Sequence, residues 1–193
     1  MTCWVVIPVK APDACKTRLA GVLTEDERRA LVSSMLQAVV AAAEAARGVD
    51  QVMLLGPSRH GLPERLRLLD DPGGGLGAAL ASALAQASAA GVVRLVILPG
   101  DLPKLMPSDV EALASLATRE IGIAPDRAEA GTNALSLPLP QAADFSFRYG
   151  EASCALHFAE AQRLRLPVRL IRTSGLGLDI DAPGDLAALA DPR

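Results

Sequence analysis

The amino-acid sequence predicts an α/β protein with a mostly parallel sheet covered by helices on both faces. Short apolar runs, such as Trp4–Val9 and Val92–Leu98, alternate with longer segments of helical periodicity. These runs are continuously apolar, as in strands that are buried on both faces, and strand–helix alternation of this kind builds parallel sheets. A length of 193 residues without repeats, low-complexity tracts or linkers predicts a single domain, residues 1–193.

The expected elements follow from these runs and from helix start signals. Two helix starts have the pattern of a capping box, Thr24 with Glu27 and Ser108 with Glu111. The first of these helices continues at helical spacing to about Arg47. Strands are expected at Trp4–Val9, Gln51–Gly56, Arg65–Asp70, Val92–Leu98, Glu120–Ala124, Ala134–Leu137 and Val168–Arg172. Further helices are expected from the glycine-rich loop to near Gly91, over Ser153–Leu164 and over Gly184–Leu189.

Composition excludes several classes of protein. Half of the residues are apolar, which excludes a disordered chain, and a net charge of −3 argues against a nucleic-acid partner. No run reaches the roughly 18 apolar residues of a membrane span, and Met1–Pro8 lacks the features of a signal peptide. Cys3, Cys15 and Cys154 show no CxxC spacing, which fits reduced thiols. We therefore expect a soluble cytoplasmic protein without a membrane partner.

A cationic loop follows the first strand. Ligands of open α/β sheets bind at the carboxyl ends of the strands, so the loops there are the most informative. Lys10, Lys16 and Arg18 place three cations within nine residues, in a chain that has three lysines against sixteen arginines. Such a loop suits a triphosphate, whose charge needs neutralising, although a solvated basic loop is the alternative. The loop is not a P-loop, because GxxxxGK[ST] is absent.

A glycine run, Gly73–Gly77, precedes the Ala-rich helix. Glycines let a backbone approach a ligand closely, and a helix N-terminus favours anions. Gly73, Gly75 and Ala78 match a loose GxGxxA fingerprint, but that fingerprint belongs on the first strand–helix turn. A nucleotide contact and a turn without a ligand are therefore both open here.

Three aspartates follow two other apolar runs. Asp101 lies between Pro99-Gly100 and Pro103 at the end of a central strand. Asp179 and Asp181 are two residues apart, so in an extended segment they face one side, where only a cation between them makes the pairing favourable. Mg²⁺ binds one or two carboxylates together with phosphates and water, so the three aspartates are candidate ligands. The alternatives are a turn cap for Asp101 and a solvated loop for the pair, and Asp185 is better explained as a first-turn helix residue.

The sequence offers no nucleophile paired with a base. His60 and His157 are expected to be structural or exposed, Cys15 has no partner base, and Gly-x-Ser-x-Gly is absent. A phosphate monoester acceptor needs no such base, because its second pKa near 6 makes it anionic at pH 7. Transfer to such an acceptor depends on positioning and on charge stabilisation, which the predicted cations supply.

The ordered motifs resemble those of the 2-phospho-L-lactate guanylyltransferase family. The motifs are PVK, KTRL, a Gly-Leu loop, LPGDLP, GTNAL, Phe-x-Tyr-Gly-x-x-Ser and GLGLDIDAPGDL, from about Val6 to Leu186. The resemblance implies a nucleotidyltransferase (nucleotide-diphospho-sugar transferase-like) fold and transfer of GMP from GTP to a small phosphorylated acid, releasing pyrophosphate. The acceptor would be 2-phospho-L-lactate, phosphoenolpyruvate or 3-phospho-D-glycerate, in the biosynthesis of coenzyme F420.

The resemblance also implies roles for particular residues. Asp101, Asp179 and Asp181 would hold Mg²⁺, and Asp101 would be catalytic together with Lys10 and Lys16. The nucleotide would be bound by Lys10, Lys16, Arg18, Gly74 and Gly75, and the phospho-acid by Thr132, Gly150 and Ser153. The glycine loop departs from the family pattern, because Gly77 stands where the family has Asn. This departure leaves open which residues recognise guanine.

Other functions remain open at this stage. Another nucleotidyltransferase of the same fold, acting on molybdopterin or a sugar phosphate, usually opens with an LAGG-type loop, which this chain lacks. A glycosyltransferase would use Asp179-x-Asp181 as its DxD motif, and a non-catalytic nucleotide-binding domain would not need all three aspartates. The sequence also leaves open which acceptor is natural and whether the chain forms a homodimer.

Overall fold

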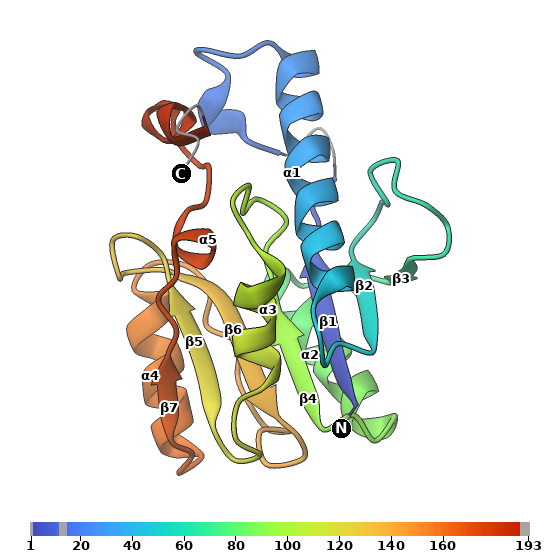
Figure 1. Ribbon diagram of the computed structural model, residues 1–193, viewed down its shortest axis with the longest axis vertical. Coiled ribbons are helices and arrows are strands. Elements are labelled where there is room, and N and C mark those ends of the chain that lie inside the picture. The colour runs from blue at the N-terminus through green and yellow to red at the C-terminus, as the bar shows by residue number, and fades with distance from the viewer. Residues whose placement is uncertain (1, 12–14, 190–193) are drawn as a thin grey trace.

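Seven strands form one sheet in the computed structural model, which describes residues 2–11 and 15–189. The strand order is β3-β2-β1-β4-β6-β5-β7, and within this sheet β6 alone runs antiparallel to its neighbours β4 and β5 (Figure 1). The mostly parallel α/β sheet is therefore confirmed. The strands are β1 (Cys3–Pro8), β2 (Gln51–Leu55), β3 (Arg67–Leu69), β4 (Arg94–Ile97), β5 (Ile121–Pro125), β6 (Thr132–Pro138) and β7 (Val168–Leu170).

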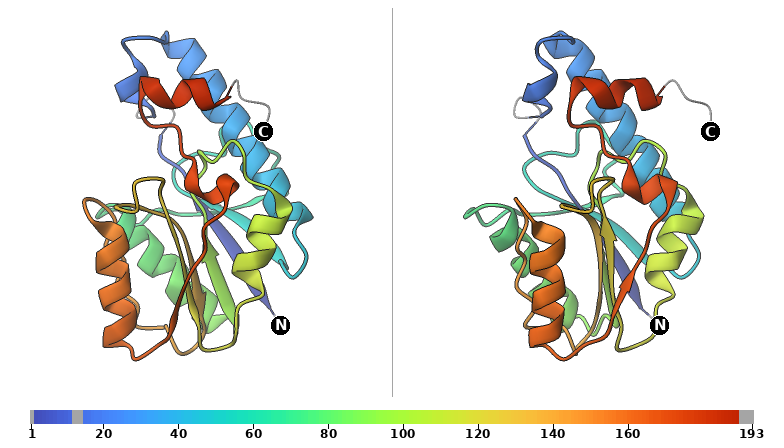
Figure 2. Two further views of the ribbon diagram at one scale, coloured as in Figure 1. Left: turned by 60° about the vertical axis from the view of Figure 1, so that its left-hand side comes forward. Right: turned by 90° about the vertical axis from the view of Figure 1, so that its left-hand side faces the viewer.

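Helices cover both faces of this sheet, as Figure 2 shows. One buried apolar cluster joins α1 and α3 to one face, and a second joins α2 and α4 to the other. The helices are α1 (Glu25–Ala45), α2 (Leu76–Ala89), α3 (Pro107–Ala114), α4 (Ser153–Arg163) and the short α5 (Ser174–Gly177), with 3₁₀ turns at Thr17–Leu19 and Pro183–Leu189. Within residues 2–11 and 15–189, none of the helices combines the length and apolar character that a membrane span requires.

A third, smaller apolar cluster lies beyond the carboxyl edge of the sheet. Leu19, Met35, Leu178 and Ile180 are its buried members, so it joins the cationic loop, α1 and the segment after α5. Figure 1 shows these parts together above the sheet. Burial of a leucine or isoleucine side chain contributes about 1.5–3 kcal/mol. This satellite cluster therefore anchors the two segments that carry most of the predicted charged residues.

The helix starts show where the sequence predictions were right and wrong. At α1 the Thr24 hydroxyl accepts from the Glu27 N–H (3.3 Å) while the Glu27 carboxylate accepts from the Thr24 N–H (2.8 Å), so the predicted capping box is confirmed. At α3 the predicted start is wrong. The helix begins at Pro107, whose fixed φ suits the first helical position, and the Asp109 carboxylate accepts from the N–H of the N-cap Met106 (2.9 Å). Ser108 therefore lies inside the first turn.

Most other elements differ from their predicted bounds by one to three residues at an end. The third strand spans Arg67–Leu69, shorter than the predicted Arg65–Asp70, and β7 ends at Leu170. The closing helix is a 3₁₀ turn, Pro183–Leu189, without buried residues. Conversely, β6 is longer than predicted, because it begins at Thr132. Short edge strands make few ladder hydrogen bonds, so their ends are the least defined by sequence.

The direction of β6 brings distant residues to one edge. Leu135 lies opposite Ile97 at the end of β4, so Thr132 and Asn133 extend past that end. An antiparallel strand begins where its parallel neighbours finish. Thr132 and Asn133 therefore lie at the same edge as Asp101, which follows β4.

Candidate active site

A large cavity opens at the carboxyl edge of the sheet, with a volume of about 920 Å³. Its walls come from the loops after β1, β2 and β4, the start of α2, the start of β6, and the segments around Tyr149 and Asp179. The predicted site residues that line it are Lys10, Lys16, Arg18, Gly75, Asp101, Thr132, Gly150, Asp179 and Asp181. Gly74 and Ser153 are not among the lining residues. The fold thus gathers nine of the predicted residues, separated by up to 171 positions, around one cavity.

The cationic loop is held at two points, and one of its residues has an unusual backbone conformation. Leu19 is fully buried in the satellite cluster. The Nε2 atom of His60 lies 2.7 Å from the Lys10 carbonyl oxygen, which ties the loop to the segment after β2. Lys16 adopts the left-handed conformation (φ 51°), which is uncommon for a residue other than glycine and occurs often at functional sites.

Lys16 connects two of the predicted aspartates. Its ammonium group forms ion pairs with Asp101 and with Asp181, the latter at 2.8 Å from Nζ to Oδ1, and its side chain is 9% exposed. Arg18 lies farther out, 4.0 Å from Asp181 Oδ2. Burial by itself would lower the pKa of Lys16, but the two carboxylates outweigh it and raise this pKa. Lys16 is therefore a firmly charged group in the wall of the cavity.

The two neighbouring aspartates respond in opposite directions. Leu178 and Ile180 are buried in the satellite cluster, so the alternating Asp179 and Asp181 face the cavity. Burial, followed by the charge of Asp101, raises the pKa of Asp179. Burial acts the same way on Asp181, but the hydrogen bond and charge of Lys16 outweigh it and lower the pKa of Asp181. Lys16 thus pairs with Asp181 and with Asp101, whereas Asp179 has no ion pair with Lys16 and accepts a hydrogen bond from Asn133.

These carboxylates bear on the predicted metal site. In the part of the chain that the structure describes, no group of three His, Cys, Asp or Glu side chains comes together as a metal site. The Lys16 ammonium bonds to both Asp101 and Asp181, in the place of a shared cation. Asp101 acts on Asp179 as a like charge, and one or two carboxylates are the protein ligands that Mg²⁺ takes beside phosphates and water. The donor chemistry fits Mg²⁺, and the three-aspartate site stays a prediction.

The cavity lining includes a polar residue, Asn133, that the sequence analysis did not single out. Asn133 is buried and donates from Nδ2 to the Leu176 carbonyl (2.8 Å) and to Asp179 Oδ1 (3.3 Å). It therefore holds the turn of α5 and one of the aspartates against β6. Its place in the GTNAL motif, beside Thr132, was the available signal.

Gly175 lets the same turn pack closely. A Cβ at Gly175 would lie 2.1 Å from Asp109 Oδ2 and 2.7 Å from the Lys104 carbonyl oxygen. Asp109 is itself buried and fixed to the N-cap of α3. Only glycine leaves room for this approach of α5 to α3, which places Asp179 at the cavity.

Helix α4 begins at Ser153, as predicted. Its N-cap is Ala152, so Ser153 is the first helical residue and does not cap the helix. The Ser153 N–H donates to the Gly150 carbonyl (3.2 Å) and the Cys154 N–H to the Ala130 carbonyl (3.1 Å). Two N–H groups of the first turn are therefore already bonded. Binding of the acceptor by Ser153 stays a prediction.

The glycine run lies at the N-terminus of α2. Gly73, Gly74 and Gly75 all have positive φ (82°, 85° and 88°), which glycine adopts without strain. Gly75 is the N-cap of α2 and lines the cavity, so the helix N-terminus opens toward it. This position suits an anion, as the nucleotide-side prediction requires.

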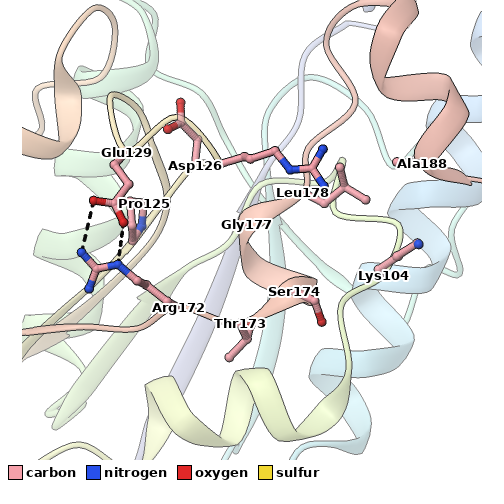
Figure 3. Close-up of a pocket in the computed structure, with 11 residues that line it drawn as sticks. Lys104, Pro125, Asp126, Glu129, Arg172, Thr173, Ser174, Gly177, Leu178 and Ala188 are labelled. Atoms are coloured by element: carbon pink, nitrogen blue, oxygen red, sulfur yellow. Dashed lines mark hydrogen bonds and ion pairs between the residues drawn. The ribbon is translucent and has the colours of Figure 1, made fainter. Parts of the chain in front are cut away.

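A second cavity of about 370 Å³ lies beside α5, and Figure 3 shows its lining. Arg172 and Glu129 face each other there in an ion pair, 2.6 Å from Nε to Oε1, and Lys104 lies on the opposite side. Among the predicted site residues, none lines this cavity. The larger cavity is therefore the candidate active site.

The fold and the cavity define the class of protein. A nucleotidyl transferase from Methanothermobacter thermautotroptrophicus has a similar structure, with a TM-score of 0.64 over 98% of this chain and 95% of that one, at 17% identity. This chain has a nucleotidyltransferase fold. Residues 3–190 match the family model described as "Guanylyl transferase CofC like", and the chain belongs to that guanylyltransferase family.

Curated relatives agree with this assignment over nearly the whole chain. The phosphoenolpyruvate guanylyltransferase of Sphaerobacter thermophilus is 42% identical, covering 98% of this chain and 93% of the relative. The 2-phospho-L-lactate guanylyltransferase of Halorubrum lacusprofundi is 34% identical, covering 96% of this chain and 82% of the relative. The family resemblance that the motifs predicted is confirmed.

Proposed function

We propose that this protein transfers GMP from GTP to a small phosphorylated acid and releases pyrophosphate, in the biosynthesis of coenzyme F420. The observation that carries the proposal is the cavity whose lining brings Lys10, Lys16 and Arg18 together with Asp101 and Thr132. Family membership supplies the transferred group, and the names of the relatives supply the acceptor class. Phosphoenolpyruvate is the first acceptor to test, and 2-phospho-L-lactate and 3-phospho-D-glycerate are the others.

The proposed reaction is an in-line displacement. A phosphate oxygen of the acceptor attacks the α-phosphorus of GTP, a new P–O bond forms, and the α–β anhydride bond breaks with its electrons going to pyrophosphate. No general base is needed, since the attacking phosphate is anionic at neutral pH. Lys10, Lys16 and Arg18 orient the triphosphate and offset the charge that develops on the leaving group.

A divalent cation fits the aspartates of this site. Asp101, Asp179 and Asp181 would hold it, with Lys16 released from Asp101 and Asp181 to the phosphates. When bound, Mg²⁺ would supply positive charge to carboxylate and phosphate oxygens together. Binding can be tested without turnover, because Mg²⁺ should raise the melting temperature of the wild type but not that of Asp179→Asn.

The part of the cavity lining that would bind the phospho-acid, here called the acceptor wall, supplies hydrogen-bond donors. Thr132 and Gly150 line the cavity, and Ser153 begins the helix that follows Gly150. A carboxylate and a phosphate on one small molecule suit such donors, because hydrogen bonds to charged groups are worth about 1.5–3 kcal/mol. GTP and phospho-acids are metabolites of the cytoplasm, and we propose that location for the protein.

The test is a matrix of nucleotides and acceptors with product masses. Pyrophosphate release is measured with GTP, ATP, CTP and UTP, each with the three phospho-acids and with a sugar phosphate. We expect GTP with at least one phospho-acid to exceed every other combination, giving a product heavier than the acceptor by one GMP unit. Equal release from ATP would contradict the nucleotide assignment, and preference for the sugar phosphate would contradict the acceptor class.

A further inference from the structure

His157 lies at the centre of a buried polar network behind the acceptor wall. It is fully buried on α4, and its ring contacts Phe145 and Tyr149, with centroids 5.7 Å and 4.9 Å away. Its Nδ1 atom lies 2.9 Å from the Thr132 hydroxyl oxygen, and its Nε2 atom lies 2.9 Å from the Arg148 backbone nitrogen. Thr132 and Tyr149 both line the cavity, whereas His157 does not line it and contacts these two residues from behind.

The Arg148 contact determines the tautomer of this ring. A backbone N–H can only donate, so Nε2 must be the acceptor and cannot carry a proton. Burial lowers the pKa of His157 to about 4, against a smaller opposing effect of Glu160, so the ring is neutral at pH 7. A neutral ring carries one proton, which is therefore on Nδ1. Nδ1 donates to Thr132, and the Thr132 oxygen is the acceptor.

This arrangement leaves the Thr132 hydroxyl proton for the cavity. A hydroxyl has one proton to donate, and here a lone pair of its oxygen is already used by Nδ1–H. Among the residues that the structure describes, His157 alone forms a hydrogen bond with this hydroxyl. Thr132 is 8% exposed, and the surface that it exposes is part of the cavity wall. Its O–H can therefore meet an acceptor atom of a ligand.

We propose that His157 is a positioning residue that fixes the Thr132 hydroxyl as a hydrogen-bond donor toward the phospho-acid. The inference rests on the proposed function and deepens it. A fixed O–H donor binds the carboxylate or phosphate oxygens of the phospho-acid, which carry no proton and only accept. It therefore favours a phospho-acid over the neutral hydroxyl groups of a sugar. His157 acts through Thr132 and makes no contact with the reacting atoms.

Two substitutions separate this role from a structural one. In His157→Asn, the amide N–H₂ takes the place of Nδ1 and can still donate to Thr132, but the contact with Arg148 is lost. In His157→Gln, the longer side chain reaches the place of Nε2 and can accept from the Arg148 N–H, but the donor to Thr132 is lost. Each variant therefore keeps one of the two hydrogen bonds.

The positioning role predicts a definite order of acceptor constants. His157→Gln should raise the acceptor KM about tenfold, with kcat and the KM for GTP within about twofold, whereas His157→Asn should stay within about threefold of wild type. His157→Gln combined with Thr132→Val should be no worse than Thr132→Val alone, since both remove the same donor. The reverse order, with Gln normal and Asn impaired, would show that His157 only anchors the Arg148 segment and would overturn the proposal.

Nitrogen-15 NMR of the histidine rings tests the geometry independently of turnover. The chain has two histidines, and the His157 signals are those that vanish in His157→Asn. At pH 7 we expect a protonated Nδ1 and an unprotonated Nε2, and an Nε2–H tautomer would overturn the proposal even if the variants misfold. Failure of the proposed function would look different, because the wild type would then release no pyrophosphate with GTP and any phospho-acid.

Discussion

The two walls of the active-site cavity are built in different ways. The cationic wall consists of ion pairs on loops, with Asp181 52% exposed and Arg18 78% exposed. The acceptor wall consists of hydrogen bonds on β6 and α4, where Thr132, Asn133 and His157 are 8%, 7% and 0% exposed. The first wall can exchange its internal ion pairs for those of a charged ligand. The second is already oriented before a ligand arrives.

This difference teaches how one cavity can hold two substrates. Lys16 is committed to Asp101 and Asp181 until phosphates or a cation compete for these groups, so nucleotide binding requires a local exchange of partners. Thr132 is fixed by a neutral buried ring and requires none. Substitutions in the first wall should therefore affect turnover, and those in the second should affect acceptor binding and stability.

The largest expected effect is at the aspartates. Asp101→Asn, Asp179→Asn and Asp181→Asn should each lower turnover at least about 100-fold, since each removes an electrostatic stabiliser of the transition state. Melting temperatures should barely fall, and Asp179→Asn removes a repulsion from Asp101. Exposed Asp144→Asn is the matched control. Near wild-type turnover for any one of the three would exclude that residue from the charged site.

Low pH should destabilise the fold through His157, behind the acceptor wall. The pKa of His157 is about 4 in the fold against an ordinary 6.5, so the unfolded chain binds the proton first as the pH falls. The free energy of unfolding should therefore fall between pH 6.5 and 4, by about 3 kcal/mol in total, and show no further contribution of His157 below that range.

Urea unfolding of wild type and His157→Asn across this range provides the measurement. The difference between the two profiles isolates His157 from the carboxylates, including the nearby Glu160. Parallel profiles would mean that this ring titrates normally in the folded protein.

Lys16 should separate binding from catalysis in the first wall. Lys16→Met should lower turnover about 10- to 100-fold while changing the KM for GTP by less than about threefold, because charge develops on pyrophosphate only as the bond breaks. Lys104→Met, outside the larger cavity, is the control. A change confined to the KM for GTP would make Lys16 a binding residue.

The smallest expected effect is at the start of α4. If Ser153 binds the acceptor, Ser153→Ala raises the acceptor KM roughly tenfold with an unchanged melting temperature, as loss of one charged hydrogen bond implies. Thr132→Val, measured in parallel, shows how much the acceptor KM rises when a residue that lines the cavity loses its hydroxyl. An unchanged acceptor KM in Ser153→Ala would restrict the pocket to Thr132 and Gly150.

Much of the fold and of the first wall could be predicted from local patterns. Continuous apolar runs indicated the strands, and Thr24 with Glu27 indicated the start of α1, because propensity and capping act over a few residues. The cations and aspartates were found because ligands of open α/β sheets bind at the carboxyl ends of the strands, where these residues follow apolar runs. The start of α3 was missed because Asp109, rather than Ser108, satisfies the free N–H.

The second wall was decided by tertiary structure. A strand pattern does not reveal strand direction, so nothing local showed that β6 runs against its neighbours and delivers Thr132 and Asn133 to the carboxyl edge. His157 gave no motif of its own, and its role depends on which backbone N–H meets Nε2, a contact across nine residues. The sequence by itself determined the α/β class, the family and the charged residues. The fold alone decided which hydroxyl is an oriented donor and which two aspartates pair with Lys16, because hydrogen-bond direction and charge pairing depend on positions that only folding brings together.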